Sequence, residues 1–152
     1  MTLRVLRWNV LACLLVLLSV SYPFSAFAES GENWAFVGFT KYRDALFIDQ
    51  NRLTGEADRQ RQVWSRITPA ERSAYFRQIR RNLKKAKKNP NEFRYIEVLN
   101  EVDCQSRRIR YLRVVYFRRD GHVISAVRDE RPAWQAVHAG SLWDNLLTMA
   151  CR

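Results

Sequence analysis

The chain has 152 residues, of which 47% are hydrophobic and 27% charged, and its formal net charge is +11 at pH 7. A chain of this length can bury one hydrophobic core but not two, so its size excludes a two-domain protein. The basic charge indicates an anionic partner surface, although a role in solubility alone is the simpler alternative.

Residues 1–28 have the order of a secretory signal peptide. Arg4 and Arg7 form a positive start, residues 10–20 form an apolar core, and Ala26-Phe27-Ala28 is a small-residue cleavage site. We therefore predict a signal peptide over 1–28 and a single mature domain over 29–152, exported to the periplasm or the cell surface. Loss of two arginines and no acidic residue lowers the net charge from +11 to +9.

Two alternatives to cleavage remain for this segment. Residues 8–28 could span a bilayer, which needs about 20 apolar residues, but Asn9, Ser19 and Pro23 dilute the stretch. Lipidation at Cys13 is disfavoured because most of the apolar core follows that cysteine. For a basic protein that is exported, an anionic lipid or a sulfated glycan is a better candidate partner than nucleic acid.

The cysteines predict one disulfide. Cys13 leaves with the signal peptide, so Cys104 and Cys151 remain, and a pair of cysteines in an exported chain is typical of a bridge. A zinc site is the alternative, but His122 and His138 lack the spacing of zinc ligands. We expect no metal and no cofactor.

The first part of the mature chain predicts three strands. They cover residues 34–40, 45–49 and 61–67, and residues 53–56 have the composition of a turn. Gly38 inside the first strand indicates a bulge or a close approach of another chain segment.

A strongly basic helix is predicted next, over residues 69–88. Thr68 and Glu71 form a capping box around Pro69, and residues 89–91 (Asn-Pro-Asn) end the helix. A narrow apolar stripe runs along it, formed by Phe76, Ile79, Leu83 and Ala86.

Most of the positive charge of the mature chain lies on this helix. We infer a candidate anion-binding surface, for an anionic membrane contacted peripherally or for a polyanion. The alternative is a helix that packs by its apolar stripe and simply solvates the cations. No aromatic ladder separates the cations, so we expect no nucleic-acid binding by base stacking. The candidate side chains are Arg77, Arg80, Arg81, Lys84, Lys85, Lys87 and Lys88.

Residues 93–128 predict a three-stranded antiparallel meander. Short breaks at 104–106 and at Asp120-Gly121 separate three runs rich in Val, Ile, Tyr and Phe. Alternation places Ile109, Tyr111, Val115 and Phe117 on one face of the second strand, opposite Leu112, Val114 and Tyr116. Both faces are partly apolar, so one is expected to carry a helix, and the other either the basic helix or a binding surface.

The chain ends in a short predicted helix. Ser141 and Asp144 form a second capping box before Leu146 and Leu147. A helix of about three turns is marginal alone in water, so we expect burial against the sheet and the bridge to Cys104 to hold it.

Enzymatic activity is not indicated. The sequence has no G-x-S-x-G motif, no metal-ligand cluster and no phosphate-binding glycine loop. His122 and His138 are consistent with ordinary surface or capping residues.

The order of these features resembles the surface-adhesin protein E family over nearly all of residues 33–152. The similarity rests on the early Trp34 strand, the strand ending at Cys104, the Asp120-Gly121 turn, Gly140-Ser141 and the terminal Cys151. The resemblance implies an α+β fold in which a disulfide tethers the C-terminal helix to one face of an antiparallel sheet of about six strands. The basic helix would be an insertion in that fold.

The resemblance also implies a non-enzymatic binding module of the cell envelope, with host-matrix proteins or an anionic surface as possible ligands. The alternative is a soluble periplasmic protein that binds anionic lipid or glycan through the basic helix, or that inhibits a hydrolase. An unidentified protein partner would fit either role, and the sequence leaves the oligomeric state open.

Overall fold

The computed structural model of the chain describes residues 33–152, so the expectations for the signal peptide and for Cys13 lie outside the described residues. The elements, in chain order, are β1 (Trp34–Phe39), β2 (Ala45–Gly55), β3 (Gln60–Thr68), α2 (Ala74–Lys85), β4 (Phe93–Asp103), β5 (Arg108–Arg118), β6 (Val123–Arg128), β7 (Gln135–Ala136) and α3 (Leu142–Ala150).

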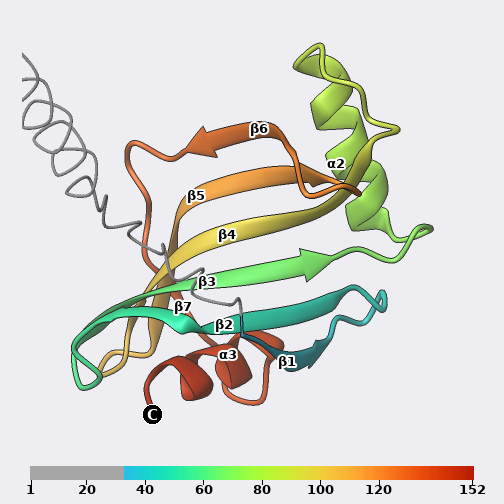
Figure 1. Cartoon of the computed structure of the whole chain (residues 1–152). Helices are drawn as coiled ribbons and strands as arrows, with labels where there is room; N and C mark the ends of the chain where they lie inside the picture. The colour runs from blue at the N-terminus through green and yellow to red at the C-terminus, as the bar shows by residue number, and fades with distance from the viewer. Residues whose placement is uncertain (1–32) are drawn as a thin grey trace, which may run out of the picture.

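The strands form one antiparallel sheet in which neighbours in sequence are neighbours in space. Its order is β1-β2-β3-β4-β5-β6, and the two-residue strand β7 pairs with β5. Figure 1 shows this meander with α2 at one corner of the sheet and α3 at the opposite end. The predicted α+β fold class and the predicted meander over β4, β5 and β6 are both confirmed.

The second strand is longer than predicted. The pairing of β2 with β3 breaks after Ile48 and resumes at Leu53, which lies opposite Val63. The residues predicted as a turn, 53–56, therefore continue the strand as far as Gly55, and the chain reverses over Glu56–Arg59 instead. The prediction was wrong because a bulge interrupts the alternation without ending the hydrogen-bonded ladder.

The basic helix begins later than the capping-box motif predicted. Thr68 is the last residue of β3, where it pairs with Ala45, so it cannot serve as a helix cap. Ser73 is the N-cap, and its hydroxyl accepts a hydrogen bond from the backbone N–H of Phe76 at 2.9 Å. Thr68 pairs with β2 as part of the sheet, although Thr68 and Glu71 have the sequence of a capping box.

The helix also ends before the predicted stop at residues 89–91. The backbone N–H of Lys87 donates to the carbonyl of Lys84 and that of Lys88 to the carbonyl of Leu83, both in the pattern that closes a helix. Lys87 has a φ of 55°, a left-handed conformation in which glycine is usual. The cations Lys87 and Lys88 therefore lie in the turn after α2.

A bulge in β5 changes which side chains face the core. Leu99 pairs with Arg113 but Asn100 pairs with Tyr111, so Leu112 is an extra residue. The predicted grouping of Ile109 and Tyr111 with Val115 and Phe117 is therefore wrong. The core-facing side chains of β5 are Ile109, Tyr111, Val114 and Tyr116, and Val115 and Phe117 face the other side.

Both helices pack against the same face of the sheet. Ile79 and Leu83 of α2 belong to the hydrophobic cluster that also contains Leu146 and Leu147 of α3. The cluster includes Ile96 and other residues of the central strands, so the helix-covered face of the sheet holds the main hydrophobic cluster. The opposite face, called here the open face, carries no helix of the described chain.

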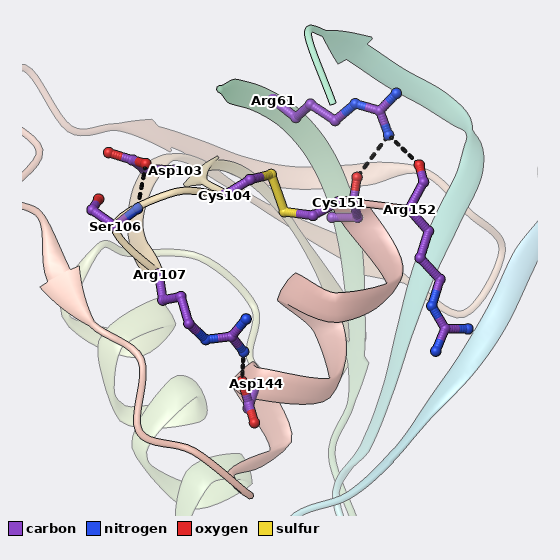
Figure 2. Close-up of a disulfide and its surroundings, with 9 residues drawn as sticks. Arg61, Asp103, Cys104, Ser106, Arg107, Asp144, Cys151 and Arg152 are labelled. Carbon is purple, nitrogen blue, oxygen red and sulfur yellow. Dashed lines mark hydrogen bonds and ion pairs between the residues drawn. A yellow bond between two sulfur atoms is a disulfide. The ribbon is translucent and has the colours of Figure 1, made fainter. Parts of the chain in front are cut away.

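The predicted disulfide joins the end of β4 to the end of α3. Cys104 and Cys151 are bonded, with their Cα atoms 5.8 Å apart (Figure 2). Arg61 adds a second tether, since its Nη1 donates to the carbonyl oxygen of Ala150 at 2.7 Å. An ion pair between Arg107 and Asp144 holds the first turn of the helix.

The start of α3 agrees with prediction. The Ser141 hydroxyl accepts from the backbone N–H of Asp144 at 3.1 Å, as an N-cap does. Gly38 lies at a register shift in β1, and a Cβ atom there would be 2.8 Å from Leu142 Cδ1. Gly38 thus marks both a bulge and the close approach of α3.

Candidate functional site

The seven candidate cations lie on the side of α2 that faces away from the core and in the turn after it. Arg77, Arg81 and Lys84 follow each other at spacings of four and three residues, which places them on one helical stripe. Ile79 and Leu83, at 4% and 2% exposure, occupy the opposite stripe against the sheet. From Arg77 to Lys84 this stripe extends about 10 Å along the helix axis.

These cations have no acidic partners. Arg77 donates to the backbone carbonyl of Arg72 at 2.5 Å, and Arg80 and Arg81 donate to the side-chain oxygens of Asn91 and Gln78. Among residues 33–152, no ion pair includes any of the seven side chains. Their positive charge is therefore not neutralised within the described part of the chain.

Five arginines of the strands differ in this respect. Arg66 pairs with Glu97 at 2.7 Å, Arg52 with Asp49 at 2.5 Å, and Arg108 with Asp103 at 3.3 Å. Similar pairs join Arg110 to Glu101 and Arg118 to Asp120. The seven cations of α2 and its following turn therefore form a cluster without acidic partners at the corner of the sheet where α2 lies.

The position of α2 limits how it can meet a membrane. An interfacial helix inserts an apolar face among the lipids, but Ile79 and Leu83 are buried in the core and Phe76 packs against it. Ala86, the last residue of the predicted apolar stripe, is the exposed C-cap of α2. Contact with an anionic surface would therefore use charge alone. No helix in residues 33–152 is long and apolar enough to cross a bilayer.

The open face carries arginines stacked on aromatic rings. The Arg66 guanidinium lies 4.1 Å from the ring centroid of Trp34 and 4.4 Å from that of Tyr95. Arg52 lies 5.2 Å from the rings of both Trp34 and Trp64. Such contacts are favourable and order long side chains. Sequence alternation did not predict this array, because the stacked residues come from four different strands.

A second exposed feature is aromatic and lies at the β1 edge of the sheet. Phe36 and Phe39 are 50% and 63% exposed, and the Phe36 ring contacts those of Phe39 and Phe47 at 4.9 and 5.6 Å. Exposed apolar clusters of this kind are typical of protein contact sites.

The helix-covered face contains a cavity that the sequence did not reveal. Its volume is about 530 Å³, and Tyr75 of α2 and Trp143 of α3 both line it. Sizes of this order are usual for small-molecule sites.

Among residues 33–152, neither histidine side chain is hydrogen-bonded to a serine, threonine or cysteine side chain. His122 lies at the tip of the β5–β6 hairpin, 77% exposed, with its Nδ1 3.3 Å from Asp120 Oδ1. A backbone hydrogen bond from His122, with the nearby charge of Arg118, lowers the pKa of Asp120. His138 is exposed in the loop before α3. Within the described residues, no group of histidine, cysteine and acidic side chains could hold a metal ion.

Comparison with known protein families identifies the family of this chain. A family model described as surface-adhesin protein E matches residues 34–152, which covers every element of the fold. The chain belongs to the surface-adhesin protein E family. No curated protein matches the chain.

Membership of the surface-adhesin protein E family agrees with the resemblance drawn from the sequence. The family name describes surface adhesins, so this chain is an adhesin-like binding module and not a member of an enzyme family. The matched range extends on both sides of α2.

Proposed function

We propose that this protein is an exported, non-enzymatic adhesin-like module that binds a sulfated glycan of a host matrix through the outer face of α2. The observation that carries the proposal is the contrast between paired arginines on the sheet and unpaired cations on α2. Arginines that already pair with acids have little charge left for a ligand, whereas the positive charge of these seven side chains is not balanced by any acidic group of residues 33–152.

The geometry favours a linear polyanion over a membrane. Arg77, Arg81 and Lys84 form one stripe along a docked helix, which matches sulfates spaced along a chain, and the buried apolar side chains Ile79 and Leu83 are not available for lipid. Binding of this kind releases counterions and therefore weakens steeply as salt rises, as it does for other polyanions.

The test compares heparin binding by the mature domain and by a variant with Arg77, Arg80, Arg81, Lys84 and Lys88 changed to Gln. The affinity of the variant should fall by at least about tenfold at low salt, and its dependence on salt should flatten. A matched control changes five exposed cations elsewhere to Gln, namely Arg43, Arg113, Arg128, Arg131 and Arg152, and should keep most of the affinity.

Three outcomes would contradict the proposal. Equal binding by the parent and the α2 variant would show that α2 is only a solvated surface. An equal loss in the control would assign binding to net charge alone. Tighter binding to vesicles of anionic phospholipid than to heparin at the same salt would make a lipid headgroup the ligand of α2.

A further inference from the structure

The cavity on the helix-covered face has an apolar floor and aromatic walls. Ile67, Ile96, Val98 and Val114 of the central strands form the floor. Tyr75 and Tyr111 line it together with Trp143, whose ring contacts that of Tyr111 at 5.8 Å. The β1–β2 turn, residues 40–44, forms the remaining rim. The cavity is therefore suited to an apolar body of modest size.

The phenol groups in this wall are neutral and available. Burial raises the pKa of Tyr111, and burial together with the neighbouring Tyr116 and Asp44 raises the pKa of Tyr75. Among the described residues, no hydrogen bond uses the hydroxyl of either tyrosine. Neutral rings that surround a cavity present their electron-rich faces to whatever occupies it.

Asp44 is the acidic group of the cavity, and it is 1% exposed. Its Oδ1 accepts from the backbone N–H of Ala70 at 3.0 Å, and its Oδ2 accepts from the Thr40 hydroxyl at 3.0 Å. Both oxygens act as acceptors, the hydrogen-bonding pattern of an ionised carboxylate, and two further lone-pair sites remain. Both donors are neutral, so they satisfy hydrogen bonding without balancing the charge.

Comparison with the other buried acids shows that Asp44 differs. The buried carboxylates of the described chain are Asp44, Asp49 and Glu97. Asp49 pairs with Arg52 at 2.5 Å, and Glu97 with Arg66 at 2.7 Å. Asp44 has no such cation, and the Lys41 ammonium at the rim lies instead over the ring of Tyr42, 5.0 Å from its centroid. A buried charge without a counter-ion is costly, so a cation in the cavity would stabilise this site.

We propose that this cavity binds an organic ammonium ion carried on an apolar body, with Asp44 as its counter-ion and the rings of Tyr75, Tyr111 and Trp143 around it. Recognition combines three contributions. The floor buries the apolar part, the aromatic faces attract the cation, and the carboxylate completes the ion pair that Asp49 and Glu97 obtain from arginines. This site lies on the covered face and does not involve the cations of α2.

The test uses two probes with the same apolar chain and opposite charge, decyltrimethylammonium and decanoate, each below its micelle concentration and at physiological salt. Fluorescence of Trp143 reports occupancy, and a Trp143→Phe variant identifies that signal. The ammonium probe should bind at least about tenfold more tightly than decanoate, a difference typical of one desolvated cation–aromatic or ion-pair contact.

Two variants separate the charge from the cavity. Asp44→Asn keeps the shape and should remove the preference for the ammonium probe. Val114→Phe fills the floor without changing any charge and should reduce binding of both probes, which keeps the proposal testable even if Asp44→Asn fails to fold. The α2 glutamine variant should bind the ammonium probe as the parent does.

Tighter binding of decanoate than of decyltrimethylammonium would overturn the proposal. So would ammonium binding that Val114→Phe leaves unchanged, because the probe would then occupy another place. The two proposed sites can fail separately. If heparin does not bind but the ammonium probe does, only the α2 site fails; if the ammonium probe does not bind but heparin does, only the cavity site fails.

Discussion

Asn100 is a polar side chain that is buried in the hydrophobic core. It interrupts the apolar alternation of β4, yet it is fully buried in the core. Its Nδ2 donates to Ser65 Oγ at 2.8 Å and to the carbonyls of Val98 and Val63 at 3.0 and 3.2 Å. A buried amide is tolerated when its donors are satisfied, so a polar residue in an apolar run here indicates an internal link between β3 and β4.

Tyr75 leads to a prediction about alkaline stability. Burial, with Tyr116 and Asp44 nearby, raises its pKa above the usual value of 10.0. The folded state therefore holds the phenol proton more tightly than the unfolded state does. The free energy of unfolding should fall as the pH rises through 10 and continue to fall towards the folded pKa.

Replacing Tyr75 by Phe should make this decline shallower by up to about 1.4 kcal/mol per pH unit, which is the linkage slope for one proton. Urea denaturation at several values between pH 9 and pH 12 measures the slope. Tyr111→Phe should flatten the curve in the same direction, since burial also raises its pKa. Parallel curves for the parent and the Tyr75→Phe variant would disprove the linkage.

At the scale of elements, α3 depends on contacts made at both of its ends. The disulfide and Arg61 hold its C-terminus, and the pair Arg107–Asp144 holds its first turn. Its buried side chains, Leu146, Leu147 and Ala150, supply the packing. A helix of nine residues would be marginal alone, so its stability comes from tertiary contacts.

The disulfide closes a segment of 47 residues, for which loop entropy predicts about 4 kcal/mol of stabilisation. Replacing Cys104 and Cys151 by Ser should lower stability by up to about that amount and open α3 before the sheet. Hydrogen exchange should then be faster in α3 than in β3 and β4.

The matched control is Arg107→Gln, which removes a partly exposed ion pair at the other end of α3 and should cost less than about 1 kcal/mol. Exchange that accelerates equally in the sheet and in α3 of the double serine variant would contradict a local role for the bridge.

At the scale of the whole molecule, α2 differs from much of the sheet in how its charges are arranged. Five strand arginines pair with acids, while α2 carries like charges at i, i+4 spacing, such as Arg77 with Arg81 and Arg80 with Lys84. Like-charged neighbours on a helix are destabilising, so the arrangement costs stability that a binding role would account for.

The α2 glutamine variant should accordingly be more stable than the parent at low salt, by about 1 kcal/mol over its like-charged pairs. The difference should narrow at about 0.5 M salt, because screening weakens the repulsion between exposed charges. Thermal unfolding of both proteins at two salt concentrations measures it. A variant less stable than the parent at low salt would show that these cations support the fold.

Local chemistry in the sequence determined much of this protein. The turn at Asp120-Gly121, the cap at Ser141, the pair Cys104–Cys151 and the basic helix could all be predicted, because each depends on neighbouring residues or on the few cysteines available. The order of these features also led to the correct family.

Only the tertiary structure determined the register of the strands and the positions of the helices on the sheet. The bulges at Leu112 and after Ile48 reset which side chains face the core, and strand pairing took Thr68 away from the helix that it was expected to cap. The packing of α2 and α3 on one face left the cavity beside Asp44. These features come from contacts between residues far apart in the chain, and local periodicity carries no information about which distant partners meet.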